Sequence, residues 1–103
     1  MSVDIREYLQ ERILILDGAM GTMLYSRGIF LNRCFDELNL THPGLVADVH
    51  SDYVQAGADV LETNTFGANR VKLAAFGLGD QVAAINRAGV ALARQAAGDR
   101  VYV

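Results

Sequence analysis

One stretch decides the fold class of this chain: Ile13-Leu14-Ile15-Leu16-Asp17-Gly18-Ala19-Met20-Gly21-Thr22. Its first four residues are apolar without alternation, which is typical of a parallel strand that is buried on both faces. The small residues after Leu16 indicate a loop at the carboxyl end of that strand. Two further β-prone segments, residues 60–63 and 101–103, each follow a stretch with helical periodicity. We therefore predict an α/β fold with about three parallel, adjacent strands and intervening helices.

The segments between these strands carry helical periodicity of different strength. Residues 5–12 place apolar side chains on one helical face, and residues 23–27 predict one or two helical turns before Gly28. A brief helix is expected over residues 70–76. Residues 29–40 have no clear period, so we expect an ordered loop there.

Two longer helices have recognisable ends. Thr41 as N-cap and Pro43 in the first turn predict a helix that ends at Gly57. Asp80 as N-cap predicts a second one that ends at Gly98. The residues expected to face the core from these two helices are Leu45, Val46, Val49, Tyr53, Val82, Ile85 and Leu92.

Composition excludes several classes of protein. The chain has 103 residues, 51% of them hydrophobic and 20% charged, which is globular composition. The net charge is −3 and Lys72 is the only lysine, so a nucleic-acid partner is not expected. The longest apolar run is too short to span a bilayer, and the first residues lack the apolar core of a secretory signal. We expect a soluble, cytoplasmic protein without membrane partners.

The last residues are apolar and β-prone: Arg100-Val101-Tyr102-Val103. Strands of folded domains are normally followed by a turn or a covering element. We interpret residues 1–103 as the amino-terminal fragment of one barrel or open-sheet domain, truncated in the third strand.

Two acidic residues, Asp17 and Glu62, lie at the predicted carboxyl ends of neighbouring strands. Chemistry in parallel α/β folds is located at that edge. A carboxylate pair there could bind an ammonium group, hold a divalent cation or act as acid and base. Alternatively, each carboxylate caps a turn or accepts backbone hydrogen bonds.

Two loops beside these acids have the composition of binding loops. Gly18 and Ala19 are small enough to let backbone N–H groups approach an anion. The row Glu62-Thr63-Asn64-Thr65-Phe66 is dense in hydrogen-bonding side chains next to an aromatic ring. A ligand could satisfy these polar groups, and so could a hydrogen-bond network within the loop.

The remaining reactive side chains do not form a site by spacing. Cys34 is the single cysteine, which excludes an internal disulfide, and we interpret it as a small buried hydrophobe. His42 is explained by the helix start. His50 is expected on the solvated side of its helix, and neither histidine belongs to a metal motif.

Three segments carry a resemblance to a known family. They are residues 13–22 quoted above, Asn32-Arg33-Cys34-Phe35-Asp36-Glu37-Leu38-Asn39, and Ala56-Gly57-Ala58-Asp59-Val60-Leu61-Glu62-Thr63-Asn64-Thr65-Phe66-Gly67-Ala68-Asn69-Arg70. In this order and spacing they resemble the homocysteine S-methyltransferase domain, from about Tyr8 to the last residue. The second segment is more like the cobalamin-dependent methionine synthases, and the bifunctional enzymes that add a methylenetetrahydrofolate reductase, than the betaine-dependent branch.

The resemblance implies a (β/α)8 barrel and zinc-dependent methyl transfer to the thiolate of homocysteine, giving methionine. It implies three zinc cysteines in later strands, beyond Val103, so this chain should carry no metal ligands and should be inactive alone. Cobalamin or a folate is the methyl source that it suggests.

The resemblance also implies which residues bind the substrate. The Asp17-Gly18-Ala19 loop and Glu62 would hold the amino-acid end of homocysteine, with backbone N–H groups on its carboxylate and acidic side chains on its ammonium. We add Asn64 to this predicted substrate site.

Two other functions remain open from the residues. One is a metal-dependent lyase or aldolase barrel that holds a hard cation on Asp17 and Glu62. The other is a non-catalytic module that pairs with a partner through the edge of the third strand.

Overall fold

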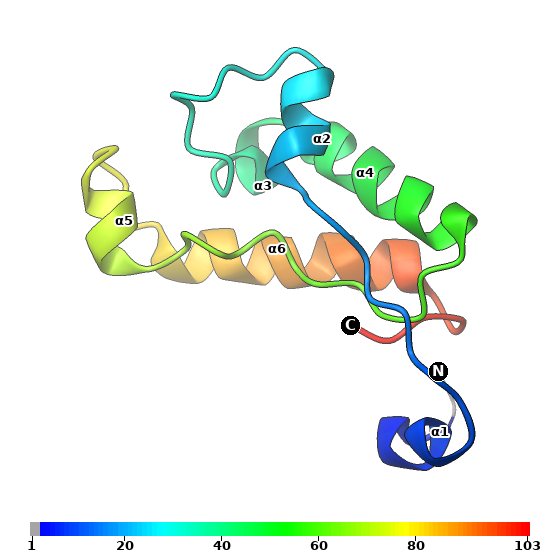
Figure 1. Ribbon diagram of the computed structural model, residues 1–103. Helices are drawn as coiled ribbons and strands as arrows, with labels where there is room; N and C mark the ends of the chain where they lie inside the picture. The colour runs from blue at the N-terminus through cyan, green and yellow to red at the C-terminus, as the bar shows by residue number, and fades with distance from the viewer. Residues whose placement is uncertain (1–2) are drawn as a thin grey trace.

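The computed structural model describes residues 3–103 as a set of helices joined by loops and short extended segments (Figure 1). The two longest helices, α4 and α6, pack on each other, while α1 projects from the end of the molecule where the extended segments meet. The helices are α1 (Ile5–Glu11), α2 (Gly21–Ser26), α3 (Leu38–Thr41), α4 (Pro43–Ala56), α5 (Arg70–Ala74) and α6 (Val82–Ala97). None of the helices in this part of the chain is long and apolar enough to cross a membrane.

Three extended segments pair in parallel, in the predicted order. Leu16 pairs with Val60, and Val60 pairs with Tyr102. The N–H of Asp17 donates to the Val60 carbonyl at 2.9 Å, and the N–H of Leu61 donates to the Tyr102 carbonyl at 2.8 Å. The middle position of the second segment is therefore confirmed.

The extent of the strands was predicted wrongly. Within residues 3–103 each pairing is a single bridge, and no continuous strand forms over 13–16, 60–63 or 101–103. One reason is that the Asp59 carboxylate accepts the N–H of Ile15 at 3.0 Å, so a side chain takes a donor that a longer ladder would use.

The apolar run before Asp17 is not buried. The exposed fractions are 89% for Ile13, 60% for Ile15 and 53% for Leu16. This segment is at the edge of the pairing, with only the second segment beside it, whereas Leu61 in the middle is 1% exposed. The prediction of a strand covered on both faces is wrong for the residues described.

The core consists of three hydrophobic clusters between the helices. The first joins α2, α3 and α4, the second lies under α5 and the start of α6, and the third joins the second and third extended segments to the end of α6. Their buried members are, in turn, Leu24, Ile29, Leu38, Val46 and Val49; Cys34, Ala68, Leu73 and Ile85; and Leu61, Ala97 and Val101. Burial of Cys34 agrees with its prediction as a small hydrophobe.

The two helix ends that were predicted from a glycine, those of α4 and α6, are confirmed. Gly57 follows α4 with φ +105°, a left-handed conformation that glycine adopts without steric cost, and Gly98 follows α6. The predicted N-caps are wrong. Thr41 is the last residue of α3, a helix in the predicted loop, so His42 precedes α4. Gln81, not Asp80, precedes α6, and its side chain makes no cap hydrogen bond. The N–H of Gln81 closes a turn on the Leu78 carbonyl at 2.9 Å.

His50 is buried, contrary to the prediction. It is 0% exposed on the inner face of α4, and neither ring nitrogen has a hydrogen-bond partner among the residues described. Desolvation lowers its pKa from the ordinary value of 6.5. The acidic neighbours Asp48 and Asp52 in the sequence had suggested a solvated face, but α4 packs against α2, α3 and α6 and leaves that side little solvent.

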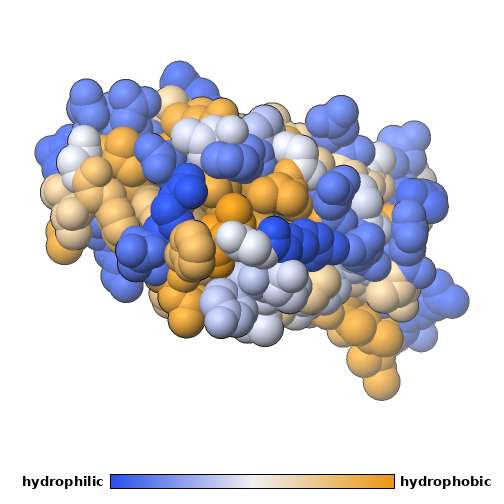
Figure 2. All heavy atoms as spheres, turned by 90° about the horizontal axis from the view of Figure 1, so that it is seen from above, coloured by the Kyte–Doolittle hydropathy of each residue, from blue (hydrophilic) through white to orange (hydrophobic). Residues whose placement is uncertain are grey.

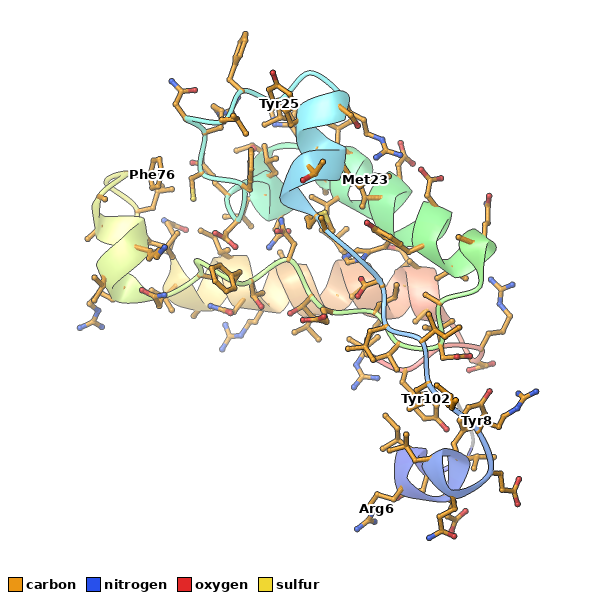
Figure 3. The ribbon with its side chains drawn as sticks, viewed as in Figure 1. Arg6, Tyr8, Met23, Tyr25, Phe76 and Tyr102 are labelled. Carbon is orange, nitrogen blue, oxygen red and sulfur yellow. The ribbon has the colours of Figure 1, made fainter. Side chains whose placement is uncertain are left out.

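Aromatic contacts attach α1 to the extended segments. Tyr8 and Tyr102 lie side by side (Figure 3), and their rings meet edge to face with centroids 5.7 Å apart. The Tyr102 hydroxyl donates to the Val3 carbonyl at 2.6 Å. At the other end of the molecule, large apolar side chains reach the surface, and Figure 2 shows hydrophobic areas interspersed with hydrophilic ones. Exposed examples are Tyr25, Phe30, Leu31, Phe66, Val71 and Phe76.

Candidate functional site

Asp17 and Glu62 meet at the end of the parallel segments. Asp17 directly follows the bridge at Leu16, and its two carboxylate oxygens accept the backbone N–H of Glu62 at 3.1 and 3.2 Å. The Glu62 side chain is exposed. The structure therefore brings the two acids together, and it also gives Asp17 the backbone contact of the alternative interpretation.

The electrostatics of this pair favour a cationic neighbour. The pKa of Asp17 is raised from 3.8, first by partial burial and further by the Glu62 carboxylate, while the N–H of Glu62 opposes this shift. The positive charge of a bound ammonium group would offset both causes, because it favours the ionised form of the half-buried Asp17 carboxylate and screens its repulsion from Glu62.

The loop after Asp17 exposes its backbone. Gly18 and Ala19 are exposed, and no hydrogen bond within residues 3–103 uses their N–H groups. The Ala19 carbonyl accepts a hydrogen bond of 2.7 Å from the Tyr53 hydroxyl. Two adjacent N–H groups next to two carboxylates can receive the two charged ends of an amino acid.

Three cavities open at this edge. One of about 360 Å³ extends from Glu62 towards Val103. The smallest, which we call the rim cavity, has a volume of about 160 Å³ and is lined by Asp17, Gly18, Met20, Glu62, Thr63, Asn64, Thr65 and Phe66. A larger one of about 480 Å³ lies beside it, and the two share Met20, Asn64 and Phe66. The predicted site residues Asp17, Gly18, Glu62 and Asn64 thus line one hollow, next to the exposed Ala19.

Comparison with known proteins decides the family. The family model for homocysteine S-methyltransferase matches residues 14–103, which is most of the chain. The chain belongs to the homocysteine S-methyltransferase family. This membership favours the methyltransferase hypothesis over the lyase and the non-catalytic module.

The proteins that this chain resembles are much longer than the chain itself. The methionine synthases of Mycobacterium tuberculosis and Mycobacterium leprae are each 35% identical over 102 residues, which is 93% of this chain but 9% and 8% of those proteins. The solved homocysteine methyltransferase MmuM from Escherichia coli matches 89% of this chain with a TM-score of 0.78 and 35% identity in its metallated form, and 0.80 and 38% in its oxidized form. In both forms the chain covers 33% of the solved structure.

Asn64 has a structural task in this family member. It is buried, and its side-chain amide donates to the Phe35 carbonyl at 2.9 Å and to Asn39 Oδ1 at 3.0 Å. Asn39 in turn donates to the Asn64 carbonyl at 2.8 Å and to the Ile85 carbonyl at 3.2 Å. Both N–H groups of Asn64 are therefore used, which leaves Oδ1 as the atom that could meet a ligand.

The described residues do not fit the zinc site that the family resemblance implies. Residues 3–103 contain no group of three or more His, Cys, Asp or Glu side chains that could hold a metal ion. Cys34 is 5% exposed and packs in the second hydrophobic cluster.

Sequence reasoning missed two residues that shape the site. The sequence predicts a loop at Asn39, although an amide side chain between Leu38 and Leu40 is a signal for a buried polar contact. Helical periodicity places Tyr53 on the hydrophobic face of its helix and predicts no role for its hydroxyl. No local pattern could have identified the partners of these two side chains.

Proposed function

We propose that residues 1–103 form the amino-terminal part of a (β/α)8 barrel that transfers a methyl group to the sulfur of homocysteine, giving methionine. Family membership and the parallel order of the three extended segments support this proposal. The 33% of the solved homocysteine methyltransferase that the chain covers is also close to the share that three extended segments would have in a barrel of eight strands.

In this proposal the chain binds the amino-acid end of homocysteine. Asp17 and Glu62 pair with the ammonium group, while the N–H groups of Gly18 and Ala19 bind the carboxylate. Asn64 Oδ1 is a further acceptor for the ammonium group. The observation that carries the assignment is the contact between the Asp17 carboxylate and the Glu62 backbone, beside a loop with unused N–H groups.

The chemical contribution of these residues is orientation. Binding both charged ends of the amino acid at one edge fixes the direction of the side chain that bears the thiol. Zinc and the methyl source, cobalamin or a folate, belong in this proposal to parts of the complete protein other than residues 3–103. We also propose a cytoplasmic location, which agrees with a single buried cysteine.

Replacement of Glu62 tests the substrate assignment in the complete protein that contains residues 1–103. We expect Glu62→Gln to raise the Kd for homocysteine about 10-fold or more, because a hydrogen bond to a charged group contributes about 1.5–3 kcal/mol. The matched control is Glu11→Gln, since Glu11 is exposed at the end of α1. Titration calorimetry gives the Kd, and elemental analysis gives the zinc content, which should not change.

Two outcomes would contradict the assignment. An unchanged Kd with loss of zinc would assign Glu62 to the metal site. Equal homocysteine affinity and equal zinc content in Glu62→Gln and Glu11→Gln would remove Glu62 from both sites.

A further inference from the structure

The hydroxyl of Tyr53 reaches from α4 to the loop that follows the first extended segment. It donates to the Ala19 carbonyl at 2.7 Å. Its ring is held by two hydrophobic clusters, the one that joins α2, α3 and α4 and the one that joins the extended segments to α6. Because the ring is fixed on both sides, the hydroxyl is a donor with a defined position.

The same ring explains the glycine before Ala19. A Cβ added at Gly18 would lie 2.9 Å from the Tyr53 hydroxyl oxygen and 3.3 Å from its Cε1. Gly18 is not among the glycines with positive φ, so its backbone conformation does not require glycine. The close approach of Tyr53 instead disfavours a side chain here, since a Cβ within 3.0 Å of the hydroxyl oxygen would force the loop or the Tyr53 ring to shift.

These two contacts set the orientation of the Ala19–Met20 peptide. In a planar trans peptide the N–H points opposite to the C=O. With the Ala19 carbonyl directed at Tyr53, the N–H of Met20 points away from α4, and Met20 lines the rim cavity. The direction of the Met20 N–H, next to the unused N–H groups of Gly18 and Ala19, thus depends on the contact between the Ala19 carbonyl and Tyr53.

We propose that Tyr53 is a positioning residue for the carboxylate of homocysteine, acting through the Gly18–Met20 loop. This inference rests on the proposed function. It adds that affinity for the carboxylate end depends on a hydroxyl on α4 that does not itself belong to the rim cavity.

Two ligands separate positioning from general structural support. L-homocysteine carries a thiol, an ammonium group and a carboxylate, whereas 3-aminopropane-1-thiol lacks only the carboxylate. In the complete protein, we expect Tyr53→Phe to raise the Kd for L-homocysteine about 2- to 10-fold, the value of one hydrogen bond. The Kd for 3-aminopropane-1-thiol should be unchanged, whereas a purely structural role would raise both.

Tyr25→Phe is the matched control, because Tyr25 lies on α2 with its side chain exposed (Figure 3). It should leave both dissociation constants unchanged. Gly18→Ala provides a second test through the crowded contact. It should weaken L-homocysteine binding more than Tyr53→Phe does, and adding Tyr53→Phe should restore part of the loss, since the nearest crowded atom is the hydroxyl oxygen.

The outcomes distinguish this inference from the proposed function. If the unaltered protein binds L-homocysteine but Tyr53→Phe behaves like Tyr25→Phe, the positioning role is wrong and the proposed function stands. Additive effects of Gly18→Ala and Tyr53→Phe also overturn it. If the unaltered protein neither binds nor methylates L-homocysteine, the proposed function is wrong and the ligand assigned to this loop is wrong with it.

Discussion

Gly89 lies in the middle of α6, at the point where this helix approaches the loop after the second extended segment. A Cβ at this position would lie 2.8 Å from Thr65 Cγ2, 2.9 Å from Asn39 Nδ2 and 3.4 Å from the Asn64 carbonyl oxygen. The φ of Gly89 is not positive, so the requirement for glycine comes from space. Gly89→Ala therefore tests whether α6 holds the loop that carries the candidate site.

The expected effect is a balance of two opposing terms. In an open helix interior, glycine to alanine stabilises by about 1 kcal/mol. Here the added methyl group overpacks a buried contact, at a cost of about 1–3 kcal/mol, and displaces the Asn39 amide from its two carbonyl acceptors, at a further cost of about 1 kcal/mol. We expect a net loss of about 1–3 kcal/mol in the free energy of unfolding.

Gly44→Ala is the control within the same protein. Gly44 lies in the first turn of α4, and a Cβ there would meet no atom within 4 Å. This variant should be neutral or stabilised by up to about 1 kcal/mol. Urea unfolding of the complete protein measures both changes.

Hydrogen exchange adds a local readout. Gly89→Ala should speed exchange of the backbone amides of residues 62–66, because their contact with α6 is weakened. If Gly89→Ala is as stable as Gly44→Ala and exchange in 62–66 is unchanged, the loop is not held against α6 and the argument for its position is refuted.

Two further predictions concern stability. His50 is buried, its ring nitrogens have no partner among the described residues, and its pKa in the folded state is lowered from 6.5. Below pH 6.5 the unfolded chain therefore binds a proton more readily than the folded protein does. The free energy of unfolding should fall with pH in this range, by up to about 1.4 kcal/mol per pH unit. His50→Leu should remove this part of the slope, and equal slopes for variant and unaltered protein in urea unfolding between about pH 7 and pH 5 would contradict it. Residues 1–103 made alone should aggregate or remain molten, because apolar residues such as Ile13 and Ile15 are exposed. They should bind no stoichiometric zinc, because residues 3–103 contain no group of three possible metal ligands. A cooperative urea transition with one tightly bound zinc per chain would disprove both statements.

Local signals in the sequence predicted much of the framework. Gly57 and Gly98 ended the two long helices as expected, since a helix end depends on a few adjacent residues. The alternation of helical and β-prone segments along the sequence predicted the parallel order of the three extended segments. In that order Asp17 and Glu62 both follow the ends of neighbouring parallel segments. The sequence could therefore also predict that these two residues lie close together.

Tertiary packing decided the rest. The Tyr53–Ala19 contact spans 34 positions in the sequence, and the Asn39–Asn64 pair spans 25. Burial of His50 and exposure of Ile13 both contradict their local patterns. Local sequence records the preferences of neighbouring residues, but whether a polar side chain is buried, and which atom satisfies it, depends on which distant segments pack around it.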